Sequence, residues 1–222
     1  MRVVSANLQH GLPDPIGRPD LARAVAPLQG LEADVYAFQE LDRRRCRTRW
    51  ADQAVQLADA LGGELLTARG KGWLWAHQRN ALVVRGEIVK RDVVRLPGPG
   101  ERRVVALAEV VVGGDRWSVG CTHLSLDPGV AVLQLHAILD ALAGWPAPRV
   151  LAGDLNLRTE RVAQVADATG WELLAGPHTI NARTRLDRRL DHVLTHGAEV
   201  VDAGVQKLPV SDHLAVWADL TT

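Results

Sequence analysis

Several features that would assign a chain to a particular class of protein are scarce or missing from these 222 residues. The two cysteines, Cys46 and Cys121, are too few and too far apart for a disulfide framework or a zinc site. No apolar run is long enough to cross a bilayer, and the first residues lack the apolar segment of a signal peptide. These absences predict a cytoplasmic protein without a transmembrane segment.

An excess of charge of one sign is missing too. Lys and Arg together number 26, as do Asp and Glu, and the sequence pI is about 7.1. A neutral chain cannot hold nucleic acid by bulk charge, although a bound divalent cation would still supply positive charge to a phosphate substrate. Linkers, internal repeats and low-complexity tracts are absent as well. A single domain over residues 1–222 is therefore predicted, and its oligomeric state stays open.

The chain does contain apolar segments that alternate with segments of helical periodicity. The predicted helices span residues 20–28, 51–61, 128–142 and 159–169. The predicted strands span residues 2–6, 35–38, 64–68, 81–84, 88–96, 102–112, 117–122, 149–153, 171–174, 191–194, 199–208 and 214–218. Because strands outnumber helices and several are followed directly by a helix, the pattern predicts an α/β protein whose helices cover a mixed sheet or two sheets.

The most informative stretch is residues 149–156, Arg-Val-Leu-Ala-Gly-Asp-Leu-Asn. Its apolar part is typical of a short buried strand that stops at Gly153, where the backbone can turn or approach another group closely. If the extended geometry continues, Asp154 and Asn156 point to the same face of the strand. That pair could hold a water, a phosphate oxygen or a metal-bound water, whereas the alternative is an ordinary Gly-Asp-x-Asn turn.

Polar residues recur wherever the predicted apolar strands stop or start. Carboxylates at such positions can bind Mg²⁺ or Mn²⁺, amides can orient a phosphate, and an Asp–His pair can hold an imidazole in one tautomer. A set of these groups on rigid strand ends could therefore form a hydrolytic site for phosphate esters. The residues concerned are Asn7, Glu40, Asn80, His123, Asp154, Asn156, Asp191, Asp212 and His213.

The same positions carry a family resemblance. The motifs, in chain order, are Val3–Asn7, Gln39-Glu40, Asn80, Thr122-His123, Gly153–Asn156, Leu190-Asp191 and Ser211-Asp212-His213. With these motifs the chain resembles the endonuclease/exonuclease/phosphatase superfamily, and in particular its small bacterial members. The resemblance implies the α/β fold of deoxyribonuclease I, a four-layer sandwich in which helices flank two mixed β-sheets. It also implies hydrolysis of a phosphoester with the help of Mg²⁺ or Mn²⁺.

The resemblance implies a metal site formed by the earliest and the latest of these motifs. Glu40 is implied as a metal ligand, Asn7 would support the metal or the phosphate, and Asp212 would join the metal site. One position departs from a branch of the family, because Gln9 stands where abasic-site endonucleases carry an Asp. That departure speaks against a second metal ligand at this position and against a DNA-repair enzyme.

The remaining motifs are implied as catalytic residues. Asp154 and Asn156 would position the attacking water and the phosphate. His213, paired with Asp191, would face the scissile phosphate. His123 would contact the phosphate from the other side and serve as the general acid. Whether an Asp or a His is the general base stays open.

Several basic and amide side chains are candidates for binding the substrate. The run from Arg43 to Arg49 directly follows Glu40, and it is either a solvated face or a grip for phosphate oxygens, which suit guanidinium groups. Arg103 stands similarly, and Asn80 precedes an apolar strand. We predict that Arg43, Arg103 and Asn80 contact the substrate.

Three functions are compatible with these features. The first is a divalent-metal-dependent phosphodiesterase that acts on nucleic acid, DNA or RNA. The second is a phosphatase or phospholipase-type hydrolase of a small or lipid phosphoester. The third is a binding module that keeps the fold without turnover, and the complete set of acids, amides and histidines speaks against it.

Overall fold

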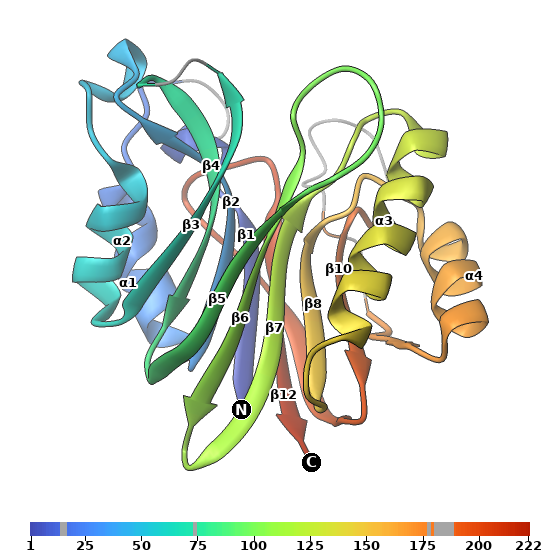
Figure 1. Ribbon diagram of the computed structural model, residues 1–222. Coiled ribbons are helices and arrows are strands. Elements are labelled where there is room, and N and C mark those ends of the chain that lie inside the picture. Colours follow the sequence, from blue (N-terminus) through green and yellow to red (C-terminus); the bar gives the residue numbers. More distant parts are fainter. Residues whose placement is uncertain (14–16, 73–74, 177–178, 180–188) are drawn as a thin grey trace.

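Two mixed β-sheets pack face to face at the centre of the molecule, and helices cover their outer faces (Figure 1). The computed structural model describes residues 1–13, 17–72, 75–176, 179 and 189–222. The arrangement has four layers, helix–sheet–sheet–helix, and confirms the predicted fold class.

The first sheet has six strands in the order β11-β12-β1-β2-β4-β3. Helices α1 (Ala22–Gly30) and α2 (Gln53–Leu61) pack against its outer face. The strands are β1 (Arg2–Asn7), β2 (Val35–Arg43), β3 (Glu64–Gly72), β4 (His77–Val84), β11 (Glu199–Lys207) and β12 (Leu214–Thr221), and the short 3₁₀ helices are η1 (Gln9–Gly11) and η2 (Cys46–Thr48).

The second sheet also has six strands, in the order β5-β6-β7-β8-β10-β9. Helices α3 (Pro128–Ala143) and α4 (Thr159–Thr169) cover its outer face. The strands are β5 (Glu87–Arg95), β6 (Val104–Val112), β7 (Asp115–His123), β8 (Arg149–Asp154), β9 (Glu172–Leu173) and β10 (Asp191–His196).

The central strands are buried on both faces, which explains why they read as nearly continuous apolar runs. In β1, Val3 packs into the core between the sheets, whereas Val4 packs towards α1 and α2. In β8, Val150 faces the same central core, and Leu151 packs towards α3 and α4. Alternate residues of one apolar run thus hold adjacent layers together.

Two parallel strand pairs determine where the polar strand ends lie. Strands β1 and β2 are parallel at the centre of the first sheet, and β7 and β8 are parallel at the centre of the second. Their carboxyl ends lie at the upper edge of the sandwich in Figure 1, away from both termini. The antiparallel strands β10 and β12 begin at this same edge. Segments from the whole chain therefore meet at one edge.

The helix ends follow from local sequence. At the start of α3, the Asp127 side chain accepts a hydrogen bond from the Val130 N–H at 2.9 Å, and Pro128 occupies the first turn. At the end of α4, Gly170 adopts the left-handed conformation with φ 71°. Among the described helices, none is both long and apolar enough to cross a membrane.

Several strand boundaries differ from those predicted, and two of these differences bear on the site. Strand β2 does not end at Phe38 but continues to Arg43, because a bulge around Glu40 lets it resume pairing with β4. Strand β4 accordingly begins at His77, so Asn80 lies inside the strand and not in front of it. The polar sequence of both segments hid this extension, because apolar periodicity is the main signal for a strand.

Candidate functional site

Three polar side chains form a row across neighbouring strands of the second sheet. In the strand register, His123 at the end of β7 lies beside Asp154 at the end of β8, and Asp154 lies beside Asp191 at the start of β10. The close approach of β7 and β8 requires Gly153, because a Cβ there would lie 2.2 Å from the carbonyl oxygen of Thr122. Regular strand pairing is thus sufficient to gather this row.

Asn7 connects the row to the first sheet. Its Nδ2 donates hydrogen bonds to Asp154 Oδ2 at 3.0 Å and to Glu40 Oε1 at 3.3 Å, while its Oδ1 accepts one from the Gln9 N–H at 3.0 Å. The Asn7 side chain therefore holds one carboxylate from each sheet next to the other. Because the nitrogen faces the carboxylates, this orientation does not offer the amide oxygen to a cation beside them, and a ligand role for Asn7 stays a prediction.

Glu40 reaches the site from a strained backbone. Its φ is 59°, and it lies in the bulge where the pairing of β2 with β4 shifts between Phe38 and Leu41. A non-glycine residue in this region costs about 1–3 kcal/mol, which the surrounding structure must offset. Such strain is typical of functional sites, where it aims a side chain that a regular strand would point elsewhere.

Other residues with positive φ flank the same site. Gln9 and His10 follow Asn7 with φ values of 42° and 49°, and Ser211 precedes Asp212 with a φ of 72°. Each lies in a short connection at the edge where the strand ends meet. The backbone around the site therefore departs from regular geometry at several points at once.

Asn156 also has a positive φ, 51°, which excludes the extended geometry after β8 and agrees with the turn, the alternative that the sequence left open. The strand ends at Asp154, so the two side chains do not share a strand face. The Asn156 N–H donates to Asp154 Oδ1 at 3.1 Å, and its Nδ2 donates to the Leu124 carbonyl at 3.1 Å. The stretch is a turn in which Asn156 supports Asp154, so the extended arrangement was wrong, and a catalytic role for Asn156 stays a prediction.

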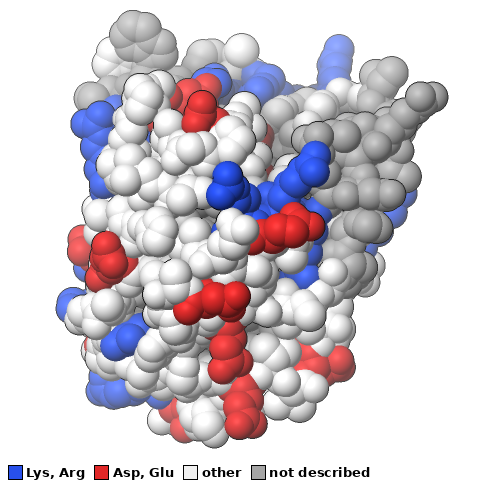
Figure 2. Space-filling view, turned by 90° about the vertical axis from the view of Figure 1, so that its right-hand side faces the viewer, with Lys and Arg blue, Asp and Glu red and all other residues white. Residues whose placement is uncertain are grey.

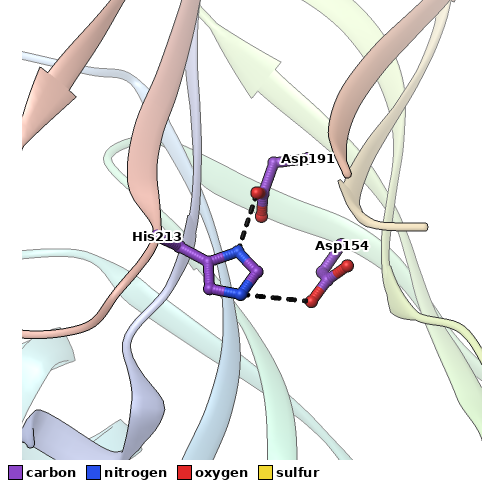
Figure 3. A group of neighbouring side chains, drawn as sticks. All are labelled: Asp154, Asp191 and His213. Atoms are coloured by element: carbon purple, nitrogen blue, oxygen red, sulfur yellow. Dashed lines mark hydrogen bonds and ion pairs between the residues drawn. The ribbon is translucent and has the colours of Figure 1, made fainter. Parts of the chain in front are cut away.

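His213 lies between two carboxylates (Figure 3). Its Nδ1 is 2.8 Å from Asp191 Oδ2, a hydrogen bond that determines the orientation of the ring. Its Nε2 faces Asp154, 3.9 Å from Oδ2, and is 4.0 Å from Asp212 Oδ1. One ring nitrogen is therefore held by a fully buried acid, and the other is presented to the interior of the site.

The charges around His213 determine its protonation. Burial alone would lower the pKa of His213, but the carboxylates of Asp191 and Asp154 raise it to about 10. Burial lowers the pKa of His123. Burial would raise the pKa of Asp154, but the nearby charges of His123 and His213 and the Asn7 hydrogen bond hold it below its usual value. At neutral pH the protein thus presents an imidazolium at His213 and a carboxylate at Asp154.

Thr179 holds the two strand starts together. Its Oγ1 accepts hydrogen bonds from the N–H groups of Leu190 at 3.0 Å and Asp191 at 3.1 Å. Its carbonyl oxygen accepts one from the Leu214 N–H at 2.6 Å. Leu214 follows His213 directly, so Thr179 ties the backbone that carries Asp191 to the backbone that carries His213.

The matching family accounts for this combination of fold and site. Residues 4–213 match the family model described as the Endonuclease/Exonuclease/phosphatase family. The chain belongs to this family. Members of the family are hydrolases that act on phosphoester bonds, and they generally use divalent metals. No curated protein sequence matches the chain.

Solved structures share the fold of this family member. An endonuclease/exonuclease/phosphatase from Beutenbergia cavernae superposes with a TM-score of 0.82 at 24% identity, covering 99% of this chain and 70% of the other. The mannosyl-6-phosphatase Bt3783 of Bacteroides thetaiotaomicron gives 0.76 at 17% identity, with all of both chains covered. D. rerio TDP2 complexed with single strand DNA product gives 0.78 at 17% identity, covering 100% and 99%.

The donor set of this family member fits a hard divalent cation. Glu40 and Asp154 bring carboxylate oxygens to either side of one amide nitrogen, and Asp212 lies nearby with its side chain 33% exposed. In the part of the chain that the structure describes, no Lys or Arg lies within ion-pair distance of Glu40. Asp154, Asp191 and His213 also bring ligand atoms within 4.8 Å of one another. Because Asp191 and His213 bind each other, the carboxylates of Glu40 and Asp154 are the better placed pair for a hard cation, and a metal site there stays a prediction.

The predicted substrate-binding residues lie in two places. Arg103 and Asn80 line a cleft that also includes Glu40 and His123. The Asn80 Nδ2 donates to the Val104 carbonyl at 3.2 Å, so its amide also links β4 to the start of β6. The substrate contacts of both residues stay predictions.

Arg43 does not line this cleft. Its Nε is 3.3 Å from Asp52 Oδ2, and its side chain is 36% exposed. Farther along the run, Arg47 binds the fully buried Asp42 carboxylate with two hydrogen bonds of 2.6 and 2.8 Å. The run is thus an ordered ion-pair cluster, and its contact with a substrate stays a prediction.

Charge is distributed unevenly over the surface although its total is zero. Figure 2 shows the side of the molecule that α3 and α4 cover. Asp and Glu side chains run down its lower middle, and a group of Lys and Arg side chains lies above them; further basic side chains lie at the lower left and a few acidic ones in the upper part. A neutral total charge is therefore compatible with a basic approach to the site.

Sequence reasoning missed three residues that the structure brings to the site. Lys71 and Arg79 line the cleft beside His123, and Thr179 anchors Asp191. Arg79 precedes the predicted Asn80 motif, so its position next to that motif was an available signal. Lys71 and Thr179 belong to no motif, because only the pairing of distant strands brings them to this edge.

Proposed function

We propose that the protein is a divalent-metal-dependent phosphodiesterase whose leading substrate is nucleic acid. The observation that carries this proposal is the geometry of His213, whose Nδ1 is bound by Asp191 and whose Nε2 faces Asp154. An imidazolium held in this way can donate a hydrogen bond to a phosphate oxygen and stabilise the charge that develops on it.

The other residues divide the remaining tasks. Asp154, a carboxylate at neutral pH, accepts a hydrogen bond from the attacking water and orients it. His123, 3.5 Å from Asp154 Oδ2, contacts the phosphate from the opposite side. A divalent cation bound at Glu40, with Asp212 nearby, would neutralise phosphate charge and polarise the phosphoester. The Asn7 amide donates to both carboxylates and so holds Glu40 next to Asp154.

Nucleic acid is favoured as the substrate because basic side chains extend beyond the reacting centre. Lys71, Arg102 and Arg103 continue the site on the side of His123, where a chain of phosphates would pass. The fold is also that of D. rerio TDP2 complexed with single strand DNA product. The second candidate is a phosphatase of a small phosphoester, because the mannosyl-6-phosphatase has the same fold over all of both chains.

A substrate panel separates these candidates. Plasmid, single-stranded DNA, RNA, bis-aryl phosphate, sphingomyelin and inositol phosphates would each be incubated with Mg²⁺ or Mn²⁺, with EDTA, and with an Asp154→Asn variant as the inactive control. We expect hydrolysis of nucleic acid and of the bis-aryl diester, and its loss in EDTA. Activity confined to monoesters would contradict the phosphodiesterase and favour the phosphatase. Full activity in EDTA would contradict the proposed role of a metal.

A further inference from the structure

A cleft with four Lys and Arg side chains among its ten lining residues adjoins the candidate site. Its walls come from the end of β3, the start of β4 and the segment that leads into β6, and it shares Glu40 and His123 with the site. The cations that line it are Lys71, Arg79, Arg102 and Arg103. A concentration of positive charge beside a phosphoester site is a place for additional negative charge on a substrate.

Two of these cations are bridged by one carboxylate from the loop before β6. Glu101 Oε1 forms an ion pair with Lys71 Nζ, and Glu101 Oε2 lies 3.3 Å from an Arg103 Nη. Arg79 differs, because it pairs with Asp52 and its side chain is only 8% exposed. The bridging carboxylate thus occupies the position that an external anion would take between Lys71 and Arg103.

The three partners differ in how firmly they are held. Arg103 is only 13% exposed, and its other Nη donates to the His123 carbonyl at 3.4 Å, which places its guanidinium next to the site. Glu101 and Lys71 are 41% and 56% exposed. Burial would raise the pKa of Glu101, but Lys71, Arg103 and His123 lower it, so the bridge is charged at neutral pH. An exposed ion pair of this kind contributes little stability and exchanges readily.

We propose that Lys71 and Arg103 form a subsite for a second phosphate group of the substrate, and that this phosphate displaces the Glu101 carboxylate. The inference rests on the proposed phosphoesterase function and names its substrate class. A phosphate offers more charge and more acceptor oxygens than a carboxylate, and Arg103 can use its planar fork to bind two of them. Glu101 then turns to solvent.

The subsite favours substrates that carry a phosphate next to the one that is cleaved. Oligonucleotides have this feature, whereas an isolated monoester or a diester with a single phosphate does not. With a single-phosphate substrate Glu101 stays in place and the basic cleft remains neutralised in part. Glu101 therefore acts as an internal competitor that only a multiply phosphorylated substrate replaces.

Two chromogenic esters test the subsite. The first is the p-nitrophenyl ester of thymidine 5′-phosphate, and the second carries an additional 3′-phosphate. The measured quantity is the kcat/KM of the second ester divided by that of the first. This ratio cancels effects of the protein's charge on the phosphate that both esters share. We expect Lys71→Gln and Arg103→Gln each to lower the ratio by about tenfold, the loss of one charge-assisted hydrogen bond.

Glu101→Gln should act in the opposite direction and raise the ratio, because it removes the competitor and keeps its size. The matched control is Glu109→Gln, which breaks the surface pair of Glu109 with Arg116 on β6 and β7 and should leave the ratio unchanged. Replacing Arg103 also removes its hydrogen bond to the His123 carbonyl and could disturb the site. Lys71 is exposed, so Lys71→Gln is the variant least affected by a folding defect.

The outcomes separate this inference from the proposed function. A ratio that Glu101→Gln lowers or leaves unchanged overturns the subsite even when both esters are hydrolysed. If neither ester is hydrolysed, the proposed function fails, and calorimetric titration with inorganic phosphate decides the subsite. Tighter phosphate binding by Glu101→Gln and weaker binding by Lys71→Gln would support it, and equal affinities of the wild type and both variants would overturn it.

Discussion

The two sheets contribute to the site in different ways. In the second sheet, His123, Asp154 and Asp191 are neighbours in an uninterrupted register, and none of them has a positive φ. In the first sheet, Glu40 reaches the site only through a bulge at φ 59°. Register follows from the apolar pattern of a strand, whereas a strained bulge persists only when its surroundings enforce it. The positions of His123, Asp154 and Asp191 therefore follow from regular strand pairing, whereas the position of Glu40 depends on a strained bulge.

The largest expected effect breaks the link between the row and His213. Asp191→Asn keeps the shape of the side chain but removes the negative charge that keeps His213 protonated, so we expect kcat to fall by about 10²–10⁴, comparable to His213→Ala. Because the pair acts as one unit, the double variant should be little worse than either single variant. The assay is hydrolysis of bis-aryl phosphate, with circular dichroism to check the fold.

Asp59→Asn, an exposed carboxylate on α2, is the matched control and should keep full activity. Losses that simply add in the double variant, with every variant folded, would show that Asp191 and His213 work separately.

A second prediction concerns the acid stability of the second sheet. His192 follows Asp191 in β10, is fully buried, and binds the Leu157 carbonyl through Nε2 at 2.9 Å. Burial lowers its pKa to about 4 from an ordinary value of 6.5. On acidification the unfolded chain thus binds the proton before the folded protein does. The contribution of a neutral His192 to the unfolding free energy is therefore complete above pH 6.5 and is lost as the pH falls from 6.5 through 4.

The loss should amount to about 3 kcal/mol of unfolding free energy across that window. Urea unfolding at several pH values would measure it in the wild type and in His192→Gln, which cannot titrate. The variant should show a shallower decline between pH 6.5 and 4. An equal decline in both proteins would assign the acid sensitivity to other groups.

A third prediction concerns the strain at Glu40. Glu40→Gly permits the positive φ without a Cβ, so the unfolding free energy should rise by about 1 kcal/mol while hydrolysis is lost with the carboxylate. Glu32→Gly is the matched control, because Glu32 is an exposed glutamate with a φ of 49° after α1. It should gain similar stability and keep full activity. A destabilised Glu40→Gly would mean that the bulge is not strained.

The smallest expected effect concerns Arg43, which extends β2 beyond the bulge. If it contacts substrate phosphates, Arg43→Gln should raise KM by about twofold to fivefold and leave kcat unchanged. Arg116→Gln, which removes a surface ion pair on β7, is the control. An unchanged KM for nucleic acid would leave Arg43 as a partner of Asp52 alone.

The difference between the sheets also explains what the sequence could reveal. Apolar runs that end in polar residues predicted an α/β protein and nearly every strand, and the family resemblance of the motifs at those ends implied the four-layer fold. The row of the second sheet lies at such ends. The bulge at Glu40 and the turn at Asn156 left no periodic signal, because both depend on positive φ values that the rest of the fold enforces. The contact of Lys71 with Glu101 joins segments with no common motif, so only the tertiary structure reveals it.

The position of β1 in the first sheet has a consequence for the timing of activity during synthesis. Strand β1 pairs with β12, and the N-terminal amine donates to the Leu220 carbonyl across 219 positions of the chain. Closing so long a loop is slow, because its entropy must be lost before the contacts form. His213 directly precedes β12, so the imidazole joins Asp154 and Asp191 only when this last strand docks. A growing chain therefore cannot form the Asp191–His213 pair before β12 has been synthesised and has docked against β1.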